Sequence, residues 1–404
     1  MNYLSCGDSG EVDKQGVLRR YRDHLSNGKA IVGQIVGGDV EVFATGAWVY
    51  TTTGRQLLNC GDRALIMGAK HPAVIESVTR QLDTNPLATS LLLEPEVALA
   101  AEALASVTPR GLEKVHFVGS GTEAVAAAIT MARAKGKSHL VNAGSARRSR
   151  HRHALHGFSS VPFGDADAMK QELARHRGRA CVIVESVQWS AGVATPPAGY
   201  LRDVQGLCRE YDAFFVLDDT RTGLGRLGYW CGADQEGVLP DVLLLGDALG
   251  GGVVPVAAAV ATSSAFQVFD RDPYMASSNV SGCPLAMAAV RGTVEAIEKD
   301  GLVQRAACIG PQLREDLERI AKTTLGNQVR EVGGVGLLIG LEFVDPGPAA
   351  NFVMELVPAG VISGYSPASP HMVRLTPPAV LTADERHVLL QSFKRAARAV
   401  LERL

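Results

Sequence analysis

Two short apolar runs, each followed by acidic residues, constrain the fold of this chain more than any other feature. The run at 214–217 is followed by Asp218 and Asp219, and the run at 242–245 is followed, one residue on, by Asp247. Continuous apolar runs of this length are typical of buried parallel strands. Ligands of open α/β sheets bind at the carboxyl ends of such strands. The two runs therefore predict strands whose polar ends meet at one site.

The stretch 214–254 resembles the core of class III aminotransferases. These are fold-type-I enzymes that use pyridoxal phosphate (PLP), and they include the ornithine, acetylornithine and 4-aminobutyrate transaminases. In that family, an Asp at the end of the first strand pairs with the pyridine nitrogen, and a Gln-Thr-Gly-like turn and a Gly-Arg segment follow. The matching residues here are Asp218, Thr222, Gly223, Gly225, Arg226 and Gly228.

The second strand of the family ends in Gly-Lys-x-Leu-Gly-Gly-Gly, and its lysine binds the cofactor as a Schiff base. Here Asp247 stands at the position of that lysine. Another lysine near the pocket would have to take over imine formation. Lys70 is a candidate, with a solvated surface role as its alternative. We therefore expect no covalently bound cofactor. PLP, or its amine form PMP, would have to bind without the lysine.

The resemblance runs from about residue 40 to the end and implies an α/β fold of the fold-type-I aminotransferase kind. This fold has a large domain, with a mainly parallel seven-stranded sheet flanked by helices, and a smaller α/β domain formed by the N- and C-terminal segments. We predict an N-terminal segment at 1–55 (small domain or dimer arm), a large domain at 56–300 and a C-terminal small domain at 301–404. A chain of 404 residues, 46% of them hydrophobic, can bury cores of this size. Because such enzymes build each site from two subunits, we expect a homodimer.

A strand, a turn and a helix are predicted between residues 115 and 135, and their junction predicts an anion site. Ser120, with Glu123 three residues on, forms a capping box before an Ala-rich helix. Backbone N–H groups at a helix start favour an anion such as phosphate, and a plain strand-to-helix turn is the alternative. The turn resembles the family's Ser-Gly-Thr-Glu-Ala motif around the PLP phosphate. The cofactor-binding residues so implied are Ser120, Gly121 and Thr122, together with Asp218.

Four further residues gain candidate roles from the resemblance. Asn279 stands where the family has a threonine that reaches the partner's cofactor phosphate, and it can still donate a hydrogen bond. Arg374 matches an arginine that can clamp a substrate carboxylate, with a structural ion pair as its alternative. Glu185 matches a Glu-Pro-x-x-Gly segment and is a candidate for substrate binding. Arg147 begins a run with four arginines and three histidines, which either binds an anion or is a solvated basic loop.

Composition excludes several classes of partner. A net charge of −2 gives no bulk attraction to nucleic acid or anionic membranes. The seven cysteines are scattered and lack metal-ligand spacing, which favours reduced thiols and predicts no metal site. There is no apolar leader and no apolar run long enough to cross a membrane. We therefore expect a cytoplasmic protein whose ligand is a small-molecule substrate.

Without the lysine, ordinary transamination is excluded, because an aspartate cannot form an imine. A carboxylate can still move a proton. Three hypotheses remain open. The first is a PLP-independent biosynthetic enzyme acting on a carboxylate-bearing, amino-acid-derived metabolite, with Asp247 as acid/base and Asp218 as a second carboxylate. The second is a lyase, dehydratase or cyclase that binds PLP or PMP without the lysine. The third is a non-catalytic homologue that supports an active partner.

Overall fold

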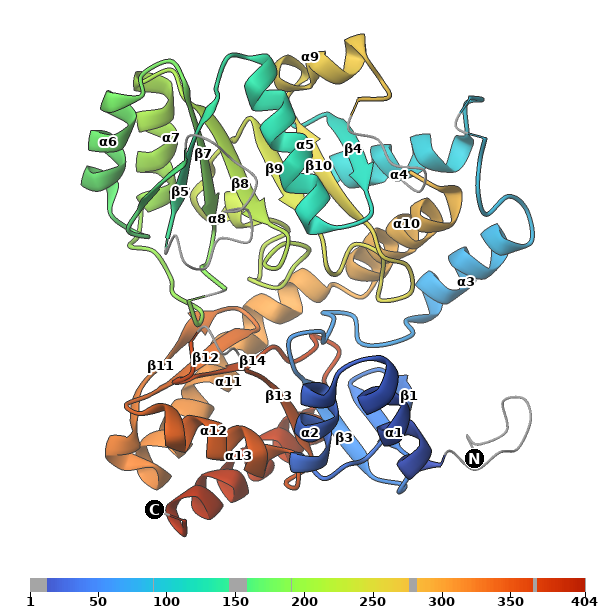
Figure 1. Cartoon of the computed structure of the whole chain (residues 1–404), viewed down its shortest axis with the longest axis vertical. Helices are drawn as coiled ribbons and strands as arrows, with labels where there is room; N and C mark the ends of the chain where they lie inside the picture. Colours follow the sequence, from blue (N-terminus) through green and yellow to red (C-terminus); the bar gives the residue numbers. More distant parts are fainter. Residues whose placement is uncertain are drawn as a thin grey trace.

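Two lobes make up the molecule, and each is built on its own seven-stranded sheet (Figure 1). The structure is a computed structural model that describes residues 13–89, 91–144, 158–189, 191–275, 282–365 and 369–403. The predicted candidates Arg147 and Asn279, and the basic run that Arg147 begins, lie outside these described residues.

The sheet of the larger lobe has the strand order β4-β10-β9-β8-β7-β5-β6. Only β10 runs antiparallel to its neighbours, β4 and β9. The mainly parallel seven-stranded sheet of the prediction is therefore confirmed. Its strands are β4 (Lys114–Val118), β5 (His139–Ala143), β6 (Phe158–Val161), β7 (Ala180–Glu185), β8 (Phe214–Asp219), β9 (Val242–Leu245) and β10 (Ala257–Ala261).

Helices cover both faces of this sheet (Figure 1), which explains its continuous apolar strands. Val216 and Leu244 belong to the core that α5 covers, whereas Leu217 and Leu245 belong to the larger core on the opposite face. The larger lobe contains α3 (Pro72–Leu82), α4 (Pro95–Ser106), α5 (Gly121–Ala134), α6 (Ala166–Arg175), α7 (Tyr200–Glu210), α8 (Gly232–Glu236), α9 (Ser263–Arg271) and α10 (Pro284–Lys299).

The second sheet joins the two ends of the chain, in the order β1-β2-β3-β13-β14-β12-β11. β3 pairs in parallel with β13, with Leu58 opposite Val361, and this pairing holds the N-terminal strands to the C-terminal ones. The boundary that we predicted between residues 55 and 56 falls between β2 and β3 of this sheet. Its strands are β1 (Glu41–Thr45), β2 (Trp48–Thr51), β3 (Gln56–Cys60), β11 (Val329–Val335), β12 (Leu338–Phe343), β13 (Val361–Tyr365) and β14 (Met372–Leu375).

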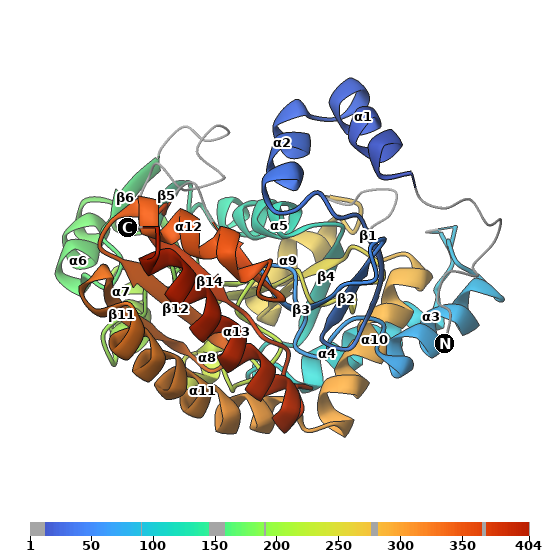
Figure 2. The same cartoon turned by 90° about the horizontal axis from the view of Figure 1, so that it is seen from below.

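The helices of the smaller lobe form two groups (Figure 2). Three pack beside the C-terminal strands: α11 (Leu302–Thr324), α12 (Pro346–Leu356) and α13 (Ala383–Leu401). The short η2 (Gly326–Gln328) connects α11 to β11. Two others, α1 (Lys14–His24) and α2 (Asn27–Ile35), pack on each other and project from the body of the molecule.

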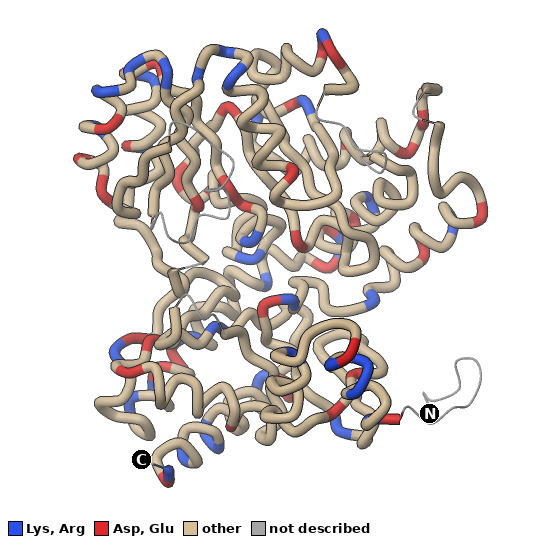
Figure 3. The backbone as a smooth tube through the Cα atoms, in the orientation of Figure 1, with Lys and Arg blue, Asp and Glu red and all other residues tan. Residues whose placement is uncertain are grey.

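Charged residues of both signs are interspersed over the two lobes (Figure 3), in keeping with the small net charge. Such a mixture creates no extended field of one sign over the molecule. Among the described helices, none combines the length and the apolar character needed to cross a membrane.

Candidate active site

Neighbouring aspartates at the end of β8 have different surroundings, because successive side chains of a strand point to opposite faces. Asp218 is half-buried, and its Oδ1 accepts hydrogen bonds from the backbone N–H of Thr220 at 3.0 Å and from the Thr220 hydroxyl at 2.7 Å. Asp219 is only 1% exposed and accepts from the hydroxyls of Ser186 and Thr222 and from the Gly232 N–H. Burial raises the pKa of Asp219, and these hydrogen bonds act in the opposite direction. Asp219 therefore holds the end of β8 to the neighbouring segments through its hydrogen bonds, while Asp218 stays closer to the surface.

Thr220 brings three predicted parts of the site together. A Cβ built on Gly121, at the start of α5, would lie 3.2 Å from Thr220 Cγ2. A Cβ built on Gly246, just after β9, would lie 3.2 Å from Thr220 Cβ. The start of α5 and the ends of β8 and β9 therefore meet around one threonine side chain. The sequence predicted that the ends of these two strands would meet.

The start of α5 differs from the predicted capping box in one of its two hydrogen bonds. Ser120 Oγ accepts from the Glu123 N–H at 3.3 Å, as expected. The Glu123 carboxylate, however, accepts from the N–H of Gly119 at 2.8 Å, one residue before the expected partner. This carboxylate satisfies one backbone donor of the turn and places a negative charge beside the predicted anion site. The family's phosphate turn contains the same Glu, and Ser120 and Thr122 are exposed at the helix start.

A cavity of about 500 Å³ lies between the two lobes, beside the ends of β8 and β9. The smaller lobe contributes residues 62–66 and Thr376, and the larger lobe contributes Trp189 and the segments after β8 and β9. No lysine is among the described residues that line it. Lys70 instead lines a groove beside α1 and α2, with its Nζ 4.5 Å from the centre of the Phe43 ring. This placement supports the solvated surface role for Lys70.

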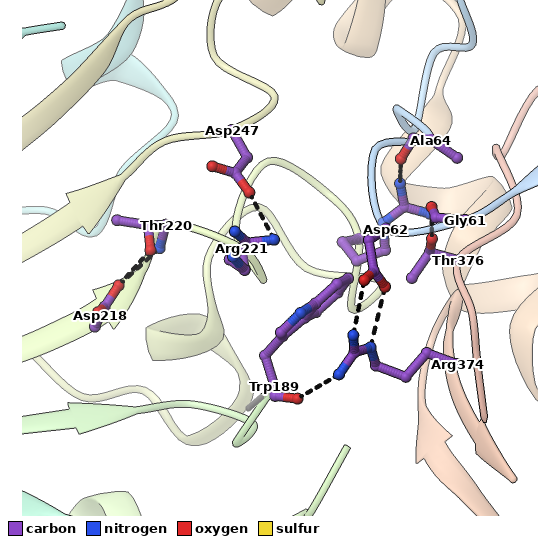
Figure 4. Close-up of polar contacts among 11 residues, drawn as sticks. Gly61, Asp62, Ala64, Trp189, Asp218, Thr220, Arg221, Asp247, Arg374 and Thr376 are labelled. Carbon is purple, nitrogen blue, oxygen red and sulfur yellow. Dashed lines mark hydrogen bonds and ion pairs between the residues drawn. The ribbon is translucent and has the colours of Figure 1, made fainter. Parts of the chain in front are cut away.

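Asp247 lines the cavity and forms an ion pair with Arg221, from the loop after β8, with 3.1 Å between Oδ2 and NH1 (Figure 4). The Asp247 side chain is 50% exposed and that of Arg221 is 25% exposed. The backbone of Asp247 has φ 26°, in the left-handed region that is costly for residues other than glycine. A strained residue with a half-exposed carboxylate therefore lies at the cavity, two residues after the end of β9.

Trp189 lies between two guanidinium groups in this cavity (Figure 4). That of Arg221 is 5.5 Å from the indole ring and that of Arg374 is 5.0 Å from it. Both distances are typical of cation–π contacts. The ring itself is buried. Trp189 therefore fixes the side chains of two arginines that come from different lobes.

Arg374, our candidate for the substrate clamp, forms a two-pronged ion pair with Asp62. Its Nε and NH2 lie 3.0 and 2.7 Å from the two carboxylate oxygens, and its NH1 donates to the Trp189 carbonyl. This is the structural ion pair that the sequence left open as the alternative. The clamp stays a prediction, and it would require a substrate carboxylate to displace Asp62.

Glu185 ends β7 close to these residues, and its Oε2 accepts the backbone N–H of Trp189 at 3.0 Å. It thus positions the segment that carries Trp189, while the predicted contact with substrate stays a prediction. Sequence reasoning did not single out Trp189, Arg221 or Asp62 as site residues. Arg221 directly precedes Thr222 of the recognised turn, and Trp189 lies four residues after Glu185. A charged or aromatic side chain next to such a motif is the signal that could have identified them.

The architecture defines the class of protein first. A seven-stranded sheet in this order with one antiparallel strand, a second domain made from both ends of the chain and a site at the strand ends are the fold of the fold-type-I PLP aminotransferases. The family model for "Aminotransferase class-III" matches residues 40–171 and 165–397. The chain belongs to the class III aminotransferase family.

Solved structures of this family agree over almost the full chain. Ornithine aminotransferase from Toxoplasma gondii is 25% identical with a TM-score of 0.87, covering 97% of this chain and 95% of that one, and its structure is described as having PLP at partial occupancy in the active site. Acetylornithine aminotransferase from Elizabethkingia anophelis is 25% identical with a TM-score of 0.83, covering 96% and 99%. Plasmodium falciparum ornithine δ-aminotransferase, at 24% identity and a TM-score of 0.85 over 97% and 100%, shares the fold.

Proposed function

We propose that this chain is a divergent class III aminotransferase homologue that does not carry out lysine-dependent transamination. In this proposal it acts without PLP on a carboxylate-bearing, amino-acid-derived metabolite, and Asp247 transfers the proton. The observation that carries the proposal is the Asp247–Arg221 ion pair at the end of β9, in a cavity whose described lining contains no lysine. Aspartate keeps one ability of the family's lysine, proton transfer, and lacks imine formation.

The residues present do not fit a covalently held PLP. The strand end that carries the Schiff-base lysine in the family carries a carboxylate here, and that carboxylate is already paired with Arg221 at 3.1 Å. The proposed chemistry therefore does not use PLP.

Arg221 gives the substrate carboxylate a reachable partner. Its ion pair with Asp247 is open to solvent, with side chains 25% and 50% exposed, whereas Arg374, paired with Asp62, is 4% exposed. Guanidinium groups bind carboxylates in the same way whether they come from the chain or from a ligand. In our proposal, the substrate carboxylate takes over Arg221 and releases Asp247 for proton transfer. Asp218 is the proposed second carboxylate, held by its two hydrogen bonds from Thr220.

A second candidate function has one observation in its favour. Thr220 packs against Gly121 at the start of α5, so the helix start and Asp218 adjoin each other as a cofactor site would require. This arrangement supports non-covalent binding of PLP or PMP in a lyase, dehydratase or cyclase. In that function Asp218 and residues 120–122 would hold the cofactor, which would supply electron withdrawal from the substrate.

We also propose that the working form is a homodimer. The segment after α3 exposes Leu91, Leu92 and Leu93 at 80%, 75% and 103%. Three adjacent leucines exposed to this degree are unusual for a surface that faces only water. Light scattering coupled to size-exclusion chromatography would measure the mass of the particle. A monomer at micromolar concentrations would contradict the proposal.

An absorbance titration with PLP and PMP tests the cofactor part of the proposal. We expect no saturable binding by the wild type, and a yellow, borohydride-reducible adduct in Asp247→Lys. Asp247→Asn is the matched control, because it removes the charge without adding an amine. Saturable binding by the wild type that Asp218→Asn weakens would overturn the proposal in favour of the second candidate.

Turnover without PLP tests the chemistry. Amino-acid-derived carboxylates would be screened with the cofactor-free protein, with products followed by mass spectrometry. For any substrate found, we expect Asp247→Asn to lower kcat by at least about 100-fold, as loss of a general acid or base does. Asp316→Asn, which breaks a surface ion pair with Arg319, is the control and should leave kcat unchanged. No turnover, together with co-purification of an active homologue, would instead support a non-catalytic role.

A further inference from the structure

Three side chains that commonly bind metals converge at the edge of the large sheet opposite the candidate active site. His139 is the first residue of β5, Glu172 lies in α6, and His176 is the C-cap residue directly after α6. β5, β7 and β8 are parallel, so their carboxyl ends lie on one side of the sheet and their starts on the other. The start of β5 therefore lies on the side away from Asp218 and Asp247. The cluster is therefore separate from the active site described above. It is the one group of this kind among the described residues.

The distances within this cluster match those between ligands of one metal ion. Glu172 Oε1 lies 3.2 Å from His176 Nε2 and 3.6 Å from His139 Nε2. Bond lengths of 2.0 to 2.1 Å in a tetrahedral zinc site place neighbouring ligand atoms about 3.3 Å apart. All three ligand atoms lie within 4.8 Å of one another. The three side chains are between 11% and 25% exposed, so they are sheltered but reachable.

We propose that His139, Glu172 and His176 bind one divalent transition-metal ion, with Zn²⁺ as the reference metal. Two imidazole nitrogens and one carboxylate oxygen form a borderline ligand set that suits Zn²⁺, Cu²⁺ or Ni²⁺ and disfavours Mg²⁺ and Ca²⁺, which prefer oxygen ligands. Three protein ligands leave a fourth position for water. The Glu172–His176 spacing of four residues places both ligands on one side of α6.

The surrounding residues show what must change when a metal binds. The His139 and His176 rings are stacked almost parallel, with 3.4 Å between their centres. An imidazole binds a metal in its own plane, so one ring has to rotate before both lone pairs reach the same ion. His176 is the more exposed of the two and lies at the helix end, which makes it the ring with room to turn. Arg175 holds the other Glu172 oxygen at 2.8 Å and orients the carboxylate.

The ion would join three segments at the border of the sheet. His139 lies in β5, and its Nε2 is 2.9 Å from the hydroxyl of Ser159 in the edge strand β6. The other two ligands lie in α6 and at its C-cap. The metal would therefore fix α6 against the last two strands of the sheet. The sequence predicted no metal site, because its cysteines lack metal-ligand spacing. These ligands come from separate segments and have no spacing motif that the sequence could reveal.

Metal binding to the full chain tests the proposal. The protein would be stripped with a chelator, and Zn²⁺ binding would be measured by competition with a chromophoric chelator. We expect one ion per chain, and a loss of affinity of at least about 100-fold in His176→Ala and in Glu172→Gln. His387→Ala, which removes an exposed histidine elsewhere, should bind as the wild type does. Binding that is unchanged in both cluster variants would overturn the proposal.

Two additional measurements remove the ambiguities of folding and of thiol ligands. Arg175→Met frees the second oxygen of Glu172, so a metal site should keep or increase its affinity, whereas a cluster that holds only ion pairs would bind no Zn²⁺ in either protein. Substitution with Co²⁺ should give visible bands of nitrogen and oxygen ligation. Intense near-ultraviolet charge-transfer bands from sulfur would assign the ion to a cysteine and contradict the proposal. Circular dichroism of each variant confirms that loss of binding is not loss of fold.

Discussion

Trp189 contacts two arginine guanidinium groups, and the ion pairs that these arginines form differ in burial and in geometry. The Arg374 side chain is 4% exposed and meets both oxygens of Asp62. The Arg221 side chain is 25% exposed, and its NH1 lies 3.1 Å from Oδ2 of Asp247, which is 50% exposed. Removing one partner of a buried pair leaves an uncompensated charge, whereas an exposed pair contributes little to stability. The comparison separates an arginine that stabilises the fold from one that can exchange its partner for a ligand.

The largest effect is expected when the buried pair is broken. Asp62→Ala should lower the free energy of unfolding by about 3 kcal/mol, because Arg374 would remain buried without its carboxylate. This value is at the low end for buried pairs, since Asp62 is itself 29% exposed. Urea unfolding followed by circular dichroism gives the measurement. A loss equal to that in Asp247→Ala would break the distinction between the two pairs.

A smaller loss is expected when the shared ring is removed. Trp189→Leu should cost about 2 kcal/mol, from lost apolar burial and two lost cation–π contacts. A double-mutant cycle with Arg221→Met would isolate the contact with the exposed arginine, for which we expect about 0.5 to 1 kcal/mol of coupling. Zero coupling in the cycle would mean that the contact with Trp189 contributes nothing to holding Arg221.

Asp219 sharpens the comparison because it is a buried carboxylate whose partners, in the described part of the chain, are hydroxyls and a backbone N–H. Burial raises its pKa above the unfolded value of about 3.9. The folded state therefore holds this proton more tightly, so its stabilising contribution is complete below pH 4 and is lost as pH rises through the folded pKa. Asp219→Asn lacks this contribution. The free energy of unfolding of the wild type, relative to that of the variant, should therefore fall as pH rises from 4. Urea unfolding curves measured across that range test this. A difference that stays constant with pH would contradict the raised pKa of Asp219.

The smallest effect is expected at the exposed pair. Asp247→Ala should change the free energy of unfolding by less than about 1 kcal/mol, and added salt should reduce even that difference, because solvent screens the pair. The measurement is a pair of urea unfolding curves at low and high ionic strength. A loss of several kcal/mol would show that Asp247 has a structural role and would weaken its assignment as the proton-transferring group.

Much of the fold could be predicted from the sequence because its strands and helix starts carry local signals. The apolar runs before Asp218 and Asp247 form β8 and β9. The class III resemblance gave the sheet and the family. The capping pattern at Ser120 predicted one hydrogen bond correctly and placed the other one residue too late.

The contacts of the site could not be predicted, because they depend on residues that are distant in the sequence. Arg374 and Asp62 are 312 positions apart, and no periodic pattern connects them. The pairing of Arg221 with Asp247 requires the loops after β8 and β9 to be adjacent in space, which the strand order determines. Sequence similarity suggested a ligand for Arg374, and the packing of the two lobes supplied Asp62 instead.

The parallel pairing of β3 with β13 also sets the order in which the chain can fold during synthesis. Leu58 pairs opposite Val361, so β3 must wait for about 300 further residues, which takes roughly 15 to 60 s at ribosomal speeds of about 5 to 20 residues per second. The strands of the large sheet lie between residues 114 and 261, and they all emerge within that interval. The larger lobe can therefore form first, while the N-terminal strands remain an unprotected edge for which a chaperone can compete until β13 arrives.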